Sequence, residues 1–342
     1  MFRLFTFPSF HNLSGRWLVL TSLVGCHPAS AHARDINVGP SRSLQTLADA
    51  VTAAGPGDRL LLDPGAYLDD TASVDTPLII EGAGSGATLK ITQHLPNQKG
   101  ILIGNADLTV RNLTFDGAFV LDREGKNGAG IRMQRGNLVV ENCTFQNNQD
   151  GMLVNPIAGA TVTISGSTFL NNGAGDGFSH GMYVNEVAQV TVRDSTFTGT
   201  KQGHSIKSRA LATTVVNTLI DDGVVGTSSY AIDLPNGGVA VIDGVKITQG
   251  PNTTNPSMIA YGAEGNLKAV NSLTVSNSTF VNKLNSPNAV AVYNFTTTVA
   301  AVLINDTAEN IATVLRGLGS GATPAGGPIL HQGAVFSSAQ SG

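Results

Sequence analysis

The sequence predicts an all-β protein that folds as a parallel β-helix, a solenoid in which short strands stack coil upon coil. Its 342 residues include 40 Gly and only 6% aromatic residues, which is typical of a turn-dense β protein. A ten-residue pattern with Thr-Phe at its seventh and eighth positions recurs along the chain, and a second family of short strands lies between its copies. Because one such unit cannot bury its own apolar face, the units must stack on one another.

Residues 1–33 are predicted to be an export signal. Two arginines precede the apolar run 17–25, which has the length of a signal-peptide core and is too short to be an integral membrane span. Cleavage within the small-residue stretch 29–33 would give a secreted or periplasmic protein. Alternatively, the sequence LVGC resembles a bacterial lipobox, and lipidated Cys26 would then anchor the chain to a membrane. If cleavage falls within 29–33, only Cys143 remains and no internal disulfide can form.

The first element expected after the signal is an amphipathic helix from about Leu44 to Ala54. It lies within 43-SLQTLADAVTAAGPGDRLLLDPGAY-67, where Gly-Asp, an apolar strand and Pro-Gly-x-Tyr follow it. A short helix at this place would cap the N-terminal end of the solenoid. Without a cap, that end would expose apolar core and an unpaired strand edge.

The Thr-Phe pattern predicts one strand, a polar bend and a second strand. Clear copies lie at 108–117, 138–147, 162–171, 190–199 and 273–282, and weaker copies lie at 214–223 and 239–250. The phenylalanines are predicted to stack in the core. Asn112, Asn142 and Asn277 are predicted to form the bend. Cys143 falls in this register and is predicted to be a buried, inert thiol.

The second strand family supplies the third side of each coil. Its copies are 129-AGIRMQ-134, 150-DGMLVN-155, 180-HGMYVN-185, 204-HSIKSR-209 and 230-YAIDLP-235. The third residue of each copy is apolar and is predicted to point into the core. Because side chains alternate faces along a strand, the residues on either side of it point outward.

The stretch 43–67 and the N-x-T-F coils together resemble the pectate-lyase-like, right-handed parallel β-helix superfamily. The resemblance covers roughly residues 42–310. It implies a right-handed β-helix domain over residues 34–316, and the Gly-rich composition that follows indicates a loop-rich C-terminal segment over 317–342. The resemblance chooses no activity, because the superfamily includes lyases, epimerases, hydrolases, esterases and non-catalytic scaffolds.

Polar side chains gather on neighbouring copies of the second strand family. Strands in a sheet lie ~4.8 Å apart, so equivalent residues form columns along the solenoid axis. One outward column is Arg132, Leu153, Tyr183, Lys207 and Asp233, the next is Gln134, Asn155, Asn185, Arg209 and Pro235, and a third, just ahead of the strands, is Ala129, Asp150, His180, His204 and Tyr230. These columns predict a groove with catalytic candidates His180, Tyr183, His204, Lys207 and Arg209 and substrate-binding candidates Arg132, Asp176, Tyr230 and Asp233.

Several of these residues also have a structural interpretation. Lys207 and Asp233 can form a solvated cross-strand ion pair, and His204 can be a plain turn residue. Asp176, in the Gly-rich loop 171–179, can contact sugar hydroxyls or cap its own turn. The concentration of ionisable side chains on one face favours a functional groove, and we expect these side chains to face solvent.

A groove of His, Tyr, Lys and Arg suits an extended anionic polymer, so the predicted partner is an acidic polysaccharide. β-Elimination at a uronate needs a cation on the carboxylate, a base for the C5 proton and an acid for the leaving oxygen. Arg209 suits the first task and Tyr183 the last, and the base is Lys207, His204 or His180. The resemblance implies the same chemistry, since β-helix polyuronate lyases use Lys or Arg bases and the related C5-epimerases use His, Tyr and Arg.

Two other classes of function stay open. A glycoside hydrolase needs two flanking carboxyl groups, and here Asp233 is the strand carboxylate beside the cations, with Asp150 and Asp176 as candidate partners. A non-catalytic carbohydrate-binding scaffold is the other alternative.

Composition and spacing bear on the other partners. The net charge of −4 without a basic run argues against nucleic acid. No cofactor or metal site is predicted, because the two histidines lack a carboxylate at ligand spacing; calcium held by scattered aspartates is the alternative. The sequence predicts no particular oligomeric state.

Overall fold

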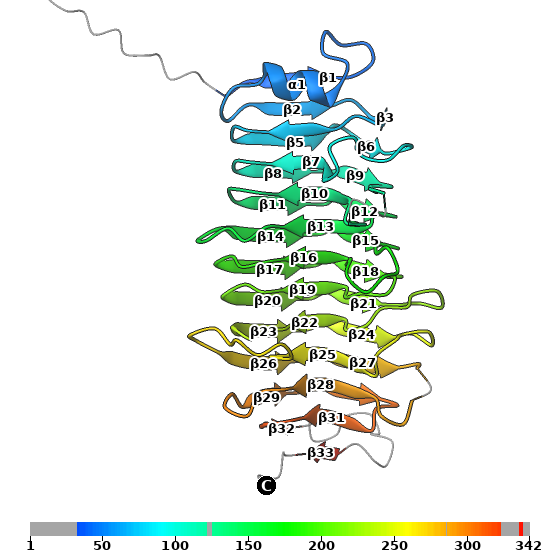
Figure 1. Cartoon of the computed structure of the whole chain (residues 1–342), viewed down its shortest axis with the longest axis vertical. Helices are drawn as coiled ribbons and strands as arrows, with labels where there is room; N and C mark the ends of the chain where they lie inside the picture. Colours follow the sequence, from blue (N-terminus) through cyan, green and yellow to red (C-terminus); the bar gives the residue numbers. More distant parts are fainter. Residues whose placement is uncertain (1–32, 122–124, 285, 323–334, 338–342) are drawn as a thin grey trace, which may run out of the picture. The chain divides into compact units, whose positions relative to one another are not determined.

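The chain coils as a parallel β-helix in a computed structural model, which describes residues 33–121, 125–284, 286–322 and 335–337 (Figure 1). Three parallel sheets run along the β-helix, with 12, 10 and 11 strands in the described part of the chain. The predicted all-β solenoid is therefore confirmed. The expected export signal and its lipobox residue Cys26 lie outside the described residues, apart from position 33.

The three sheets are named A, B and C. Sheet A consists of β1 (Asp35–Val38), β2 (Arg59–Leu62), β5 (Leu78–Gly82), β8 (Leu108–Arg111), β11 (Leu138–Glu141), β14 (Thr161–Ser165), β17 (Gln189–Arg193), β20 (Ala212–Val216), β23 (Val239–Asp243), β26 (Ser272–Ser276), β29 (Ala301–Ile304) and β32 (Gly319–Ala322). Sheet B consists of β3 (Gly65–Leu68), β6 (Ala87–Lys90), β9 (Leu113–Asp116), β12 (Thr144–Gln146), β15 (Thr168–Leu170), β18 (Thr196–Thr198), β21 (Leu219–Asp221), β24 (Lys246–Gln249), β27 (Thr279–Asn282) and β30 (Thr307–Glu309). Sheet C consists of β4 (Ala72–Val74), β7 (Gly100–Gly104), β10 (Ala129–Met133), β13 (Asp150–Val154), β16 (Met182–Val184), β19 (Ile206–Ser208), β22 (Ile232–Leu234), β25 (Ser257–Tyr261), β28 (Val290–Asn294), β31 (Thr313–Arg316) and β33 (Val335–Ser337).

Each coil turns sharply where sheet A meets sheet B. The predicted bend residues Asn112, Asn142 and Asn277 have φ angles of 51°, 53° and 51°, in the left-handed region. Asparagine tolerates this conformation better than other side-chain-bearing residues, because its short polar side chain bonds locally. The Asn112 amide also donates to the Gly82 carbonyl of the preceding coil at 2.7 Å. The asparagines therefore set the bend, and the Asn112 side chain also ties neighbouring coils together.

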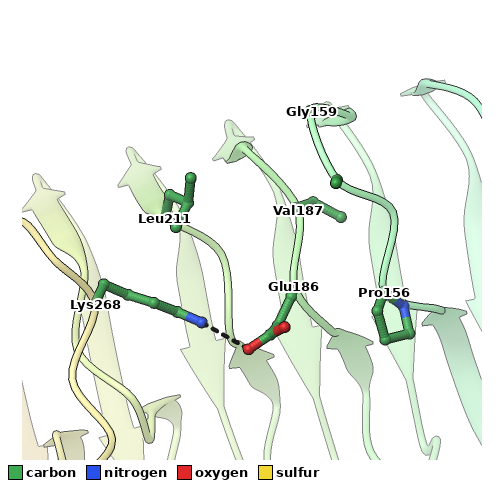
Figure 2. Close-up of a pocket in the computed structure, with 7 residues that line it drawn as sticks. Pro156, Gly159, Glu186, Val187, Leu211 and Lys268 are labelled. Carbon is green, nitrogen blue, oxygen red and sulfur yellow. Dashed lines mark hydrogen bonds and ion pairs between the residues drawn. The ribbon is translucent and has the colours of Figure 1, made fainter.

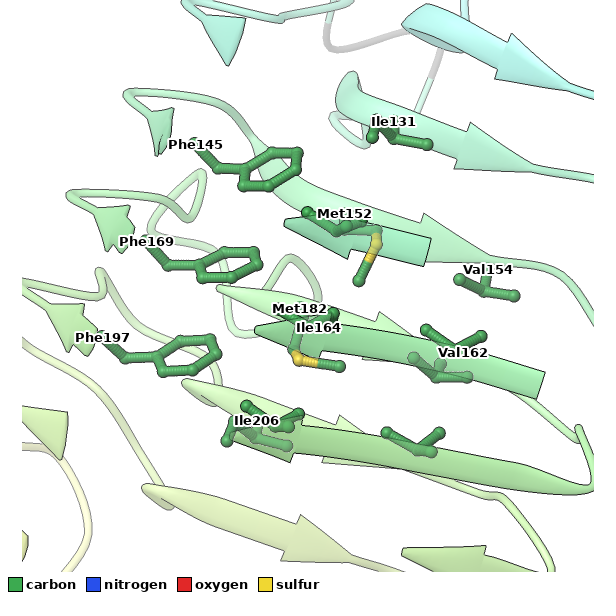
Figure 3. Close-up of a cluster of buried hydrophobic side chains, with 14 of the residues drawn as sticks. Ile131, Phe145, Met152, Val154, Val162, Ile164, Phe169, Met182, Phe197 and Ile206 are labelled. Carbon is green, nitrogen blue, oxygen red and sulfur yellow. The ribbon is translucent and has the colours of Figure 1, made fainter. Parts of the chain in front are cut away.

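The core consists of columns of apolar side chains that repeat once per coil (Figure 3). Phe115, Phe145, Phe169 and Phe197 stack with ring centroids 4.9, 4.7 and 4.4 Å apart, as predicted. Cys143 is buried, and burial raises the pKa of its thiol to about 12, so it is inert at neutral pH.

One helix is found among the described residues, α1 (Leu47–Ala53), at the N-terminal end of the β-helix (Figure 1). It buries Leu47 and Ala50 against the first coil, as the predicted cap requires. It is shorter than the expected range of 44–54, because Thr46 caps it by accepting from the Asp49 amide at 3.1 Å. Within the described part of the chain, no helix combines the length and apolarity needed to cross a membrane.

Strand pairing continues past residue 316, where the loop-rich segment was expected to begin. Strand β32 pairs in parallel with β29 of the preceding coil. Its sequence GSGA lacks the apolar alternation that identifies a strand, but strand pairing uses only backbone groups. In sheet A the β-helix therefore continues to residue 322, beyond the end at 316 that the composition indicated.

Candidate active site

The candidate active site lies on the outward face of sheet C, at β16, β19 and β22. In the observed register Tyr183 pairs with Lys207, and Lys207 pairs with Asp233. The residues before them, Met182 and Ile206, are fully buried and hold this register. A slip of one residue would turn the polar side chains into the core. The predicted column is therefore confirmed.

A column of rings precedes these strands. His180 stacks on His204 at 4.8 Å between ring centroids, and His204 stacks on Tyr230 at 5.3 Å. His180 also meets Tyr183 edge-to-face at 5.2 Å. The backbone amide of His204 donates to Nδ1 of His180 at 3.0 Å, so neutral His180 carries its proton on Nε2. The repeat therefore brings together both predicted histidines and both predicted tyrosines.

Both histidines are neutral at physiological pH. Burial, together with the charges of Lys207 and Arg209, lowers the pKa of His204 to about 3 and places that of His180 well below its usual value. Nδ1 of His204 is buried 3.6 Å from an oxygen of Asp233. The accessible nitrogen of His204 is therefore Nε2, and the Asp233 carboxylate faces the other side of the ring.

Lys207 lies between two carboxylates. Its Nζ is 3.2 Å from Oδ2 of Asp233 and 3.2 Å from Oε1 of Glu264, and 5.6 Å from the centre of the Tyr183 ring. Asp233 is only 3% exposed. Burial raises the pKa of its carboxyl to about 6, although the Lys207 charge acts in the opposite direction.

Arg209 joins the remaining groups. Its Nε donates to the Tyr183 hydroxyl at 2.9 Å, its Nη1 donates to Asn236, and its Nη2 lies 2.7 Å from Glu264. Because the Tyr183 oxygen accepts from Arg209, the hydroxyl proton of Tyr183 stays available for another acceptor.

Glu264 was missed by the sequence interpretation. It lies on the loop 262–271 between β25 and β26, the longest connection from sheet C to sheet A among the described residues. The loop is fixed by backbone bonds from Glu264 to Pro235 and from Lys268 to Asn236. Only the length of this connection, compared with the shorter turns of other coils, could have drawn attention to it.

The expected exposure of the site was wrong. Lys207 is 9% exposed and His180 3%, and the His204 side chain is 12% exposed. The cations are also not free, because Lys207 and Arg209 both bond Glu264. Stacked rings and a long loop bury outward side chains that strand alternation alone would leave in solvent.

Two predicted substrate-binding residues lie apart from this cluster. Arg132 is on β10, two strands from Tyr183, and donates to Asn155 at 3.1 Å. Asp176 accepts from the backbone amides of Phe178 and Ser179 at 2.9 and 3.1 Å, so it caps its own turn. The turn-capping alternative is therefore the one observed for Asp176.

Asp150 lies one coil before the ring column and bonds the backbone of its first residue, His180. It is buried, and it accepts from the backbone amide of His180 at 2.7 Å. Burial raises the pKa of its carboxyl to about 8. Asp150 is therefore protonated in the folded protein at neutral pH.

We expect Asp150→Asn to remove a pH dependence of stability. The Asp150 carboxyl ionises near ~3.9 in the unfolded chain but at about 8 when folded, so its stabilising contribution is full below ~3.9 and is lost as the pH rises to about 8. Asparagine keeps the acceptor oxygen and does not titrate. Melting temperatures between about pH 5 and pH 8 should fall less for the variant than for the wild type. If the melting temperatures of the variant and the wild type fall equally over this pH range, the raised pKa assigned to Asp150 is contradicted.

A pocket of about 460 Å³ lies beside the site, where sheet C strands turn into sheet A (Figure 2). Its lining residues are Pro156, Ala158, Gly159, Glu186, Val187, Leu211 and Lys268. Lys268 Nζ bonds Glu186 at 3.0 Å across it. The loop that carries Glu264 to the cations therefore also spans this pocket.

Metal binding has no support in the described geometry. Within the ranges that the structure describes, no group of three or more His, Cys, Asp or Glu side chains is placed to hold a metal ion. The calcium alternative stays a prediction.

Comparisons with known proteins agree on the fold. A family model described as "Right handed beta helix region" matches residues 78–220. No curated protein is detectably similar in sequence. The solved structure of an alginate lyase from Paenibacillus sp. str. FPU-7 aligns with a TM-score of 0.52 and 17% identity over 84% of this chain and 99% of that chain. The chain is a right-handed parallel β-helix, as the resemblance implied.

Two further solved structures align less well. The A-module of a mannuronan C-5 epimerase from Azotobacter vinelandii has a TM-score of 0.33 and 16% identity over 81% of this chain and 93% of that chain. A pectin methylesterase from Aspergillus niger has a TM-score of 0.38 and 13% identity over 80% and 85% of the two chains. These two proteins differ in activity, and neither alignment assigns an activity to this chain.

Proposed function

We propose that the chain is a carbohydrate-active enzyme that removes the C5 proton of a uronate unit in an acidic polysaccharide, with β-elimination as the reaction. One observation carries the proposal: a neutral His204, whose Nδ1 faces Asp233, lies in one cluster with Tyr183 and two cations, Lys207 and Arg209. Base, acid and carboxylate-binding groups are the three requirements of elimination.

The cations supply the carboxylate site. Lys207 and Arg209 already hold one carboxylate, that of Glu264, at 3.2 and 2.7 Å. Glu264 is 47% exposed and comes from a loop, so a substrate carboxylate can take its place. With the carboxylate neutralised, the C5 proton becomes acidic. Arg209 suits this task because its charge is fixed and its donors form a planar fork.

The proton transfers are assigned from two features: Nδ1 of His204 faces Asp233, and the Tyr183 oxygen accepts from Arg209. Nε2 of His204 accepts the C5 proton, and the Asp233 carboxylate stabilises the imidazolium that forms. The Tyr183 hydroxyl donates its proton to the glycosidic oxygen as the C4–O4 bond breaks, and a C4=C5 double bond forms. If Tyr183 instead gives its proton to the opposite face of C5 and the C4–O4 bond stays intact, the same groups perform epimerisation. Lys207 is assigned to carboxylate binding, because it contacts two carboxylates.

Replacing Glu264 tests its role as the displaceable carboxylate. We expect Glu264→Gln to lower KM for an anionic polysaccharide by about three- to tenfold, since the substrate no longer competes with a resident charge. The matched control is Glu186→Gln, which breaks the other ion pair of the same loop and should leave KM unchanged. A rise in KM would contradict the role.

A glycoside hydrolase is the second candidate, and Glu264 is the observation that favours it. Asp233 and Glu264 contact the same ammonium group, and their pKa values move in opposite directions. Burial raises that of Asp233, whereas for Glu264 the effect of burial is outweighed by Arg209 and Lys207, which lower it. Two carboxyl groups with separated pKa values are the requirement for glycoside hydrolysis. In that case Glu264→Gln abolishes turnover.

Product analysis distinguishes these reactions. The protein is incubated with alginate, polygalacturonate and other uronate polysaccharides, and absorbance of the unsaturated uronate is followed together with new reducing ends. Elimination raises both signals, hydrolysis raises only the second, and epimerisation or a binding scaffold raises neither.

A further inference from the structure

The outward face of sheet C continues past the candidate active site to a second group of side chains. In register, Asp233 on β22 pairs with Ala260, Ala260 pairs with Tyr293, and Tyr293 pairs with Arg316. At ~4.8 Å per strand, Tyr293 lies roughly 10 Å and Arg316 roughly 14 Å along the axis from Asp233. One face of one sheet therefore carries both groups.

Tyr293 and Phe295 form an aromatic platform outside the core. They occupy alternate positions at the end of β28, and Asn294 between them is buried, so both rings face outward. Their ring centroids are 3.6 Å apart with planes 19° from parallel, and Phe295 is 36% exposed. The phenylalanine column of the core lies on sheet B, whereas these two rings lie on and just after a strand of sheet C.

Arg316 lies over this platform. Its guanidinium carbon is 5.2 Å from the centre of the Tyr293 ring. Its side chain makes no ion pair or hydrogen bond with any residue that the structure describes, whereas Lys207 and Arg209 each bond a carboxylate. A guanidinium without a carboxylate partner is ready to bond one from a ligand.

The platform adjoins the active-site rings. Burial raises the pKa of Tyr230, and the neighbouring Asp233 and Tyr293 add to the rise. Tyr230, the last ring of the column that begins at His180, lies on the same coil as Asp233, and Tyr293 is two strands further along, roughly 10 Å along the axis. The candidate base and the platform therefore lie on the same face of sheet C, with the Ala260 coil between them.

We propose that Tyr293, Phe295 and Arg316 form a second binding subsite for an acidic sugar unit. The apolar face of the sugar ring packs on the aromatic platform, and the sugar carboxylate bonds Arg316. The inference rests on the proposed function, because the ligand is a further unit of the same polysaccharide whose reacting unit lies at His204. The charge of Arg316 and its position on the same sheet face both fit this ligand.

The subsite is tested by removing its charge. The affinity of Arg316→Gln for alginate and for polygalacturonate is measured by affinity electrophoresis, with the carboxyl-reduced, neutral polymer as a second probe. We expect binding of the acidic polymer that the wild type binds to weaken by about three- to tenfold, the scale of one charge-assisted contact. Binding of the neutral polymer should change little. The matched control is Arg193→Gln, which removes an exposed arginine from sheet A and should bind as the wild type does.

The possible results separate this subsite from the proposed reaction. Wild-type affinity in Arg316→Gln, with or without a lower melting temperature, would mean that the Arg316–Tyr293 contact only stabilises the last coils, and would overturn the subsite. If the wild type binds the polymer without converting it, and Arg316→Gln binds it less tightly, the subsite stands and the reaction fails. If the wild type binds neither acidic polymer, both are overturned.

Discussion

Replacement of His204 by alanine is expected to reduce turnover of an acidic polysaccharide by about a hundredfold or more, the usual scale for a general base. The reason is the position of His204: its Nδ1 faces Asp233 and its Nε2 is the accessible nitrogen. The measurement is the initial rate of unsaturated product at saturating substrate. Because His204 is largely buried between two rings, the melting temperature is measured alongside the rate.

Controls separate loss of the base from loss of structure. His204→Gln keeps a polar side chain in the ring column and should be as inactive as the alanine variant. His94→Ala removes an exposed histidine elsewhere and should retain wild-type rates. Wild-type-like turnover in His204→Ala, Lys207→Ala and His180→Ala would remove the elimination mechanism and favour the binding scaffold.

Arg209→Ala is expected to lower kcat/KM by about a hundred- to a thousandfold, the scale of losing a donor that stabilises developing charge. Arg209 bonds both the resident carboxylate and the Tyr183 hydroxyl, so its loss affects carboxylate binding and the orientation of the acid together. The measurement pairs steady-state rates with equilibrium binding of the same polymer.

Arg209→Lys is the matched variant, because it keeps the charge and loses the planar fork. We expect it to recover part of the affinity and little of kcat. A non-catalytic binder would lose affinity in Arg209→Ala and would form no product in any variant. Unchanged kcat/KM in Arg209→Ala would exclude this residue from the reaction.

The fold and the columns could be predicted because a solenoid repeats its register. The length of one coil can be counted from Phe145 to Phe169, and the inward residues Met182 and Ile206 show which side chains share a face. Parallel stacking of the coils then places Tyr183, Lys207 and Asp233 in one column. Local patterns determine these relations, so the sequence alone is sufficient for them.

Burial and partners across coils could not be predicted in the same way. Glu264 reaches Lys207 from 57 residues along the chain, through a loop that follows no repeat. The exposure of His204 depends on the rings stacked on both sides of it, which strand alternation does not describe. Strand β32 was missed because backbone pairing needs no apolar side chains.

The central claim is that this site removes the C5 proton of a uronate. It is tested most directly by NMR of the products formed by the wild-type protein from alginate and polygalacturonate in D₂O. The account predicts a vinylic signal from a C4=C5 double bond, or deuterium at C5 of an uncleaved chain if the reaction is epimerisation. Saturated products with new reducing ends and no deuterium at C5, or no change in any polymer, would contradict it.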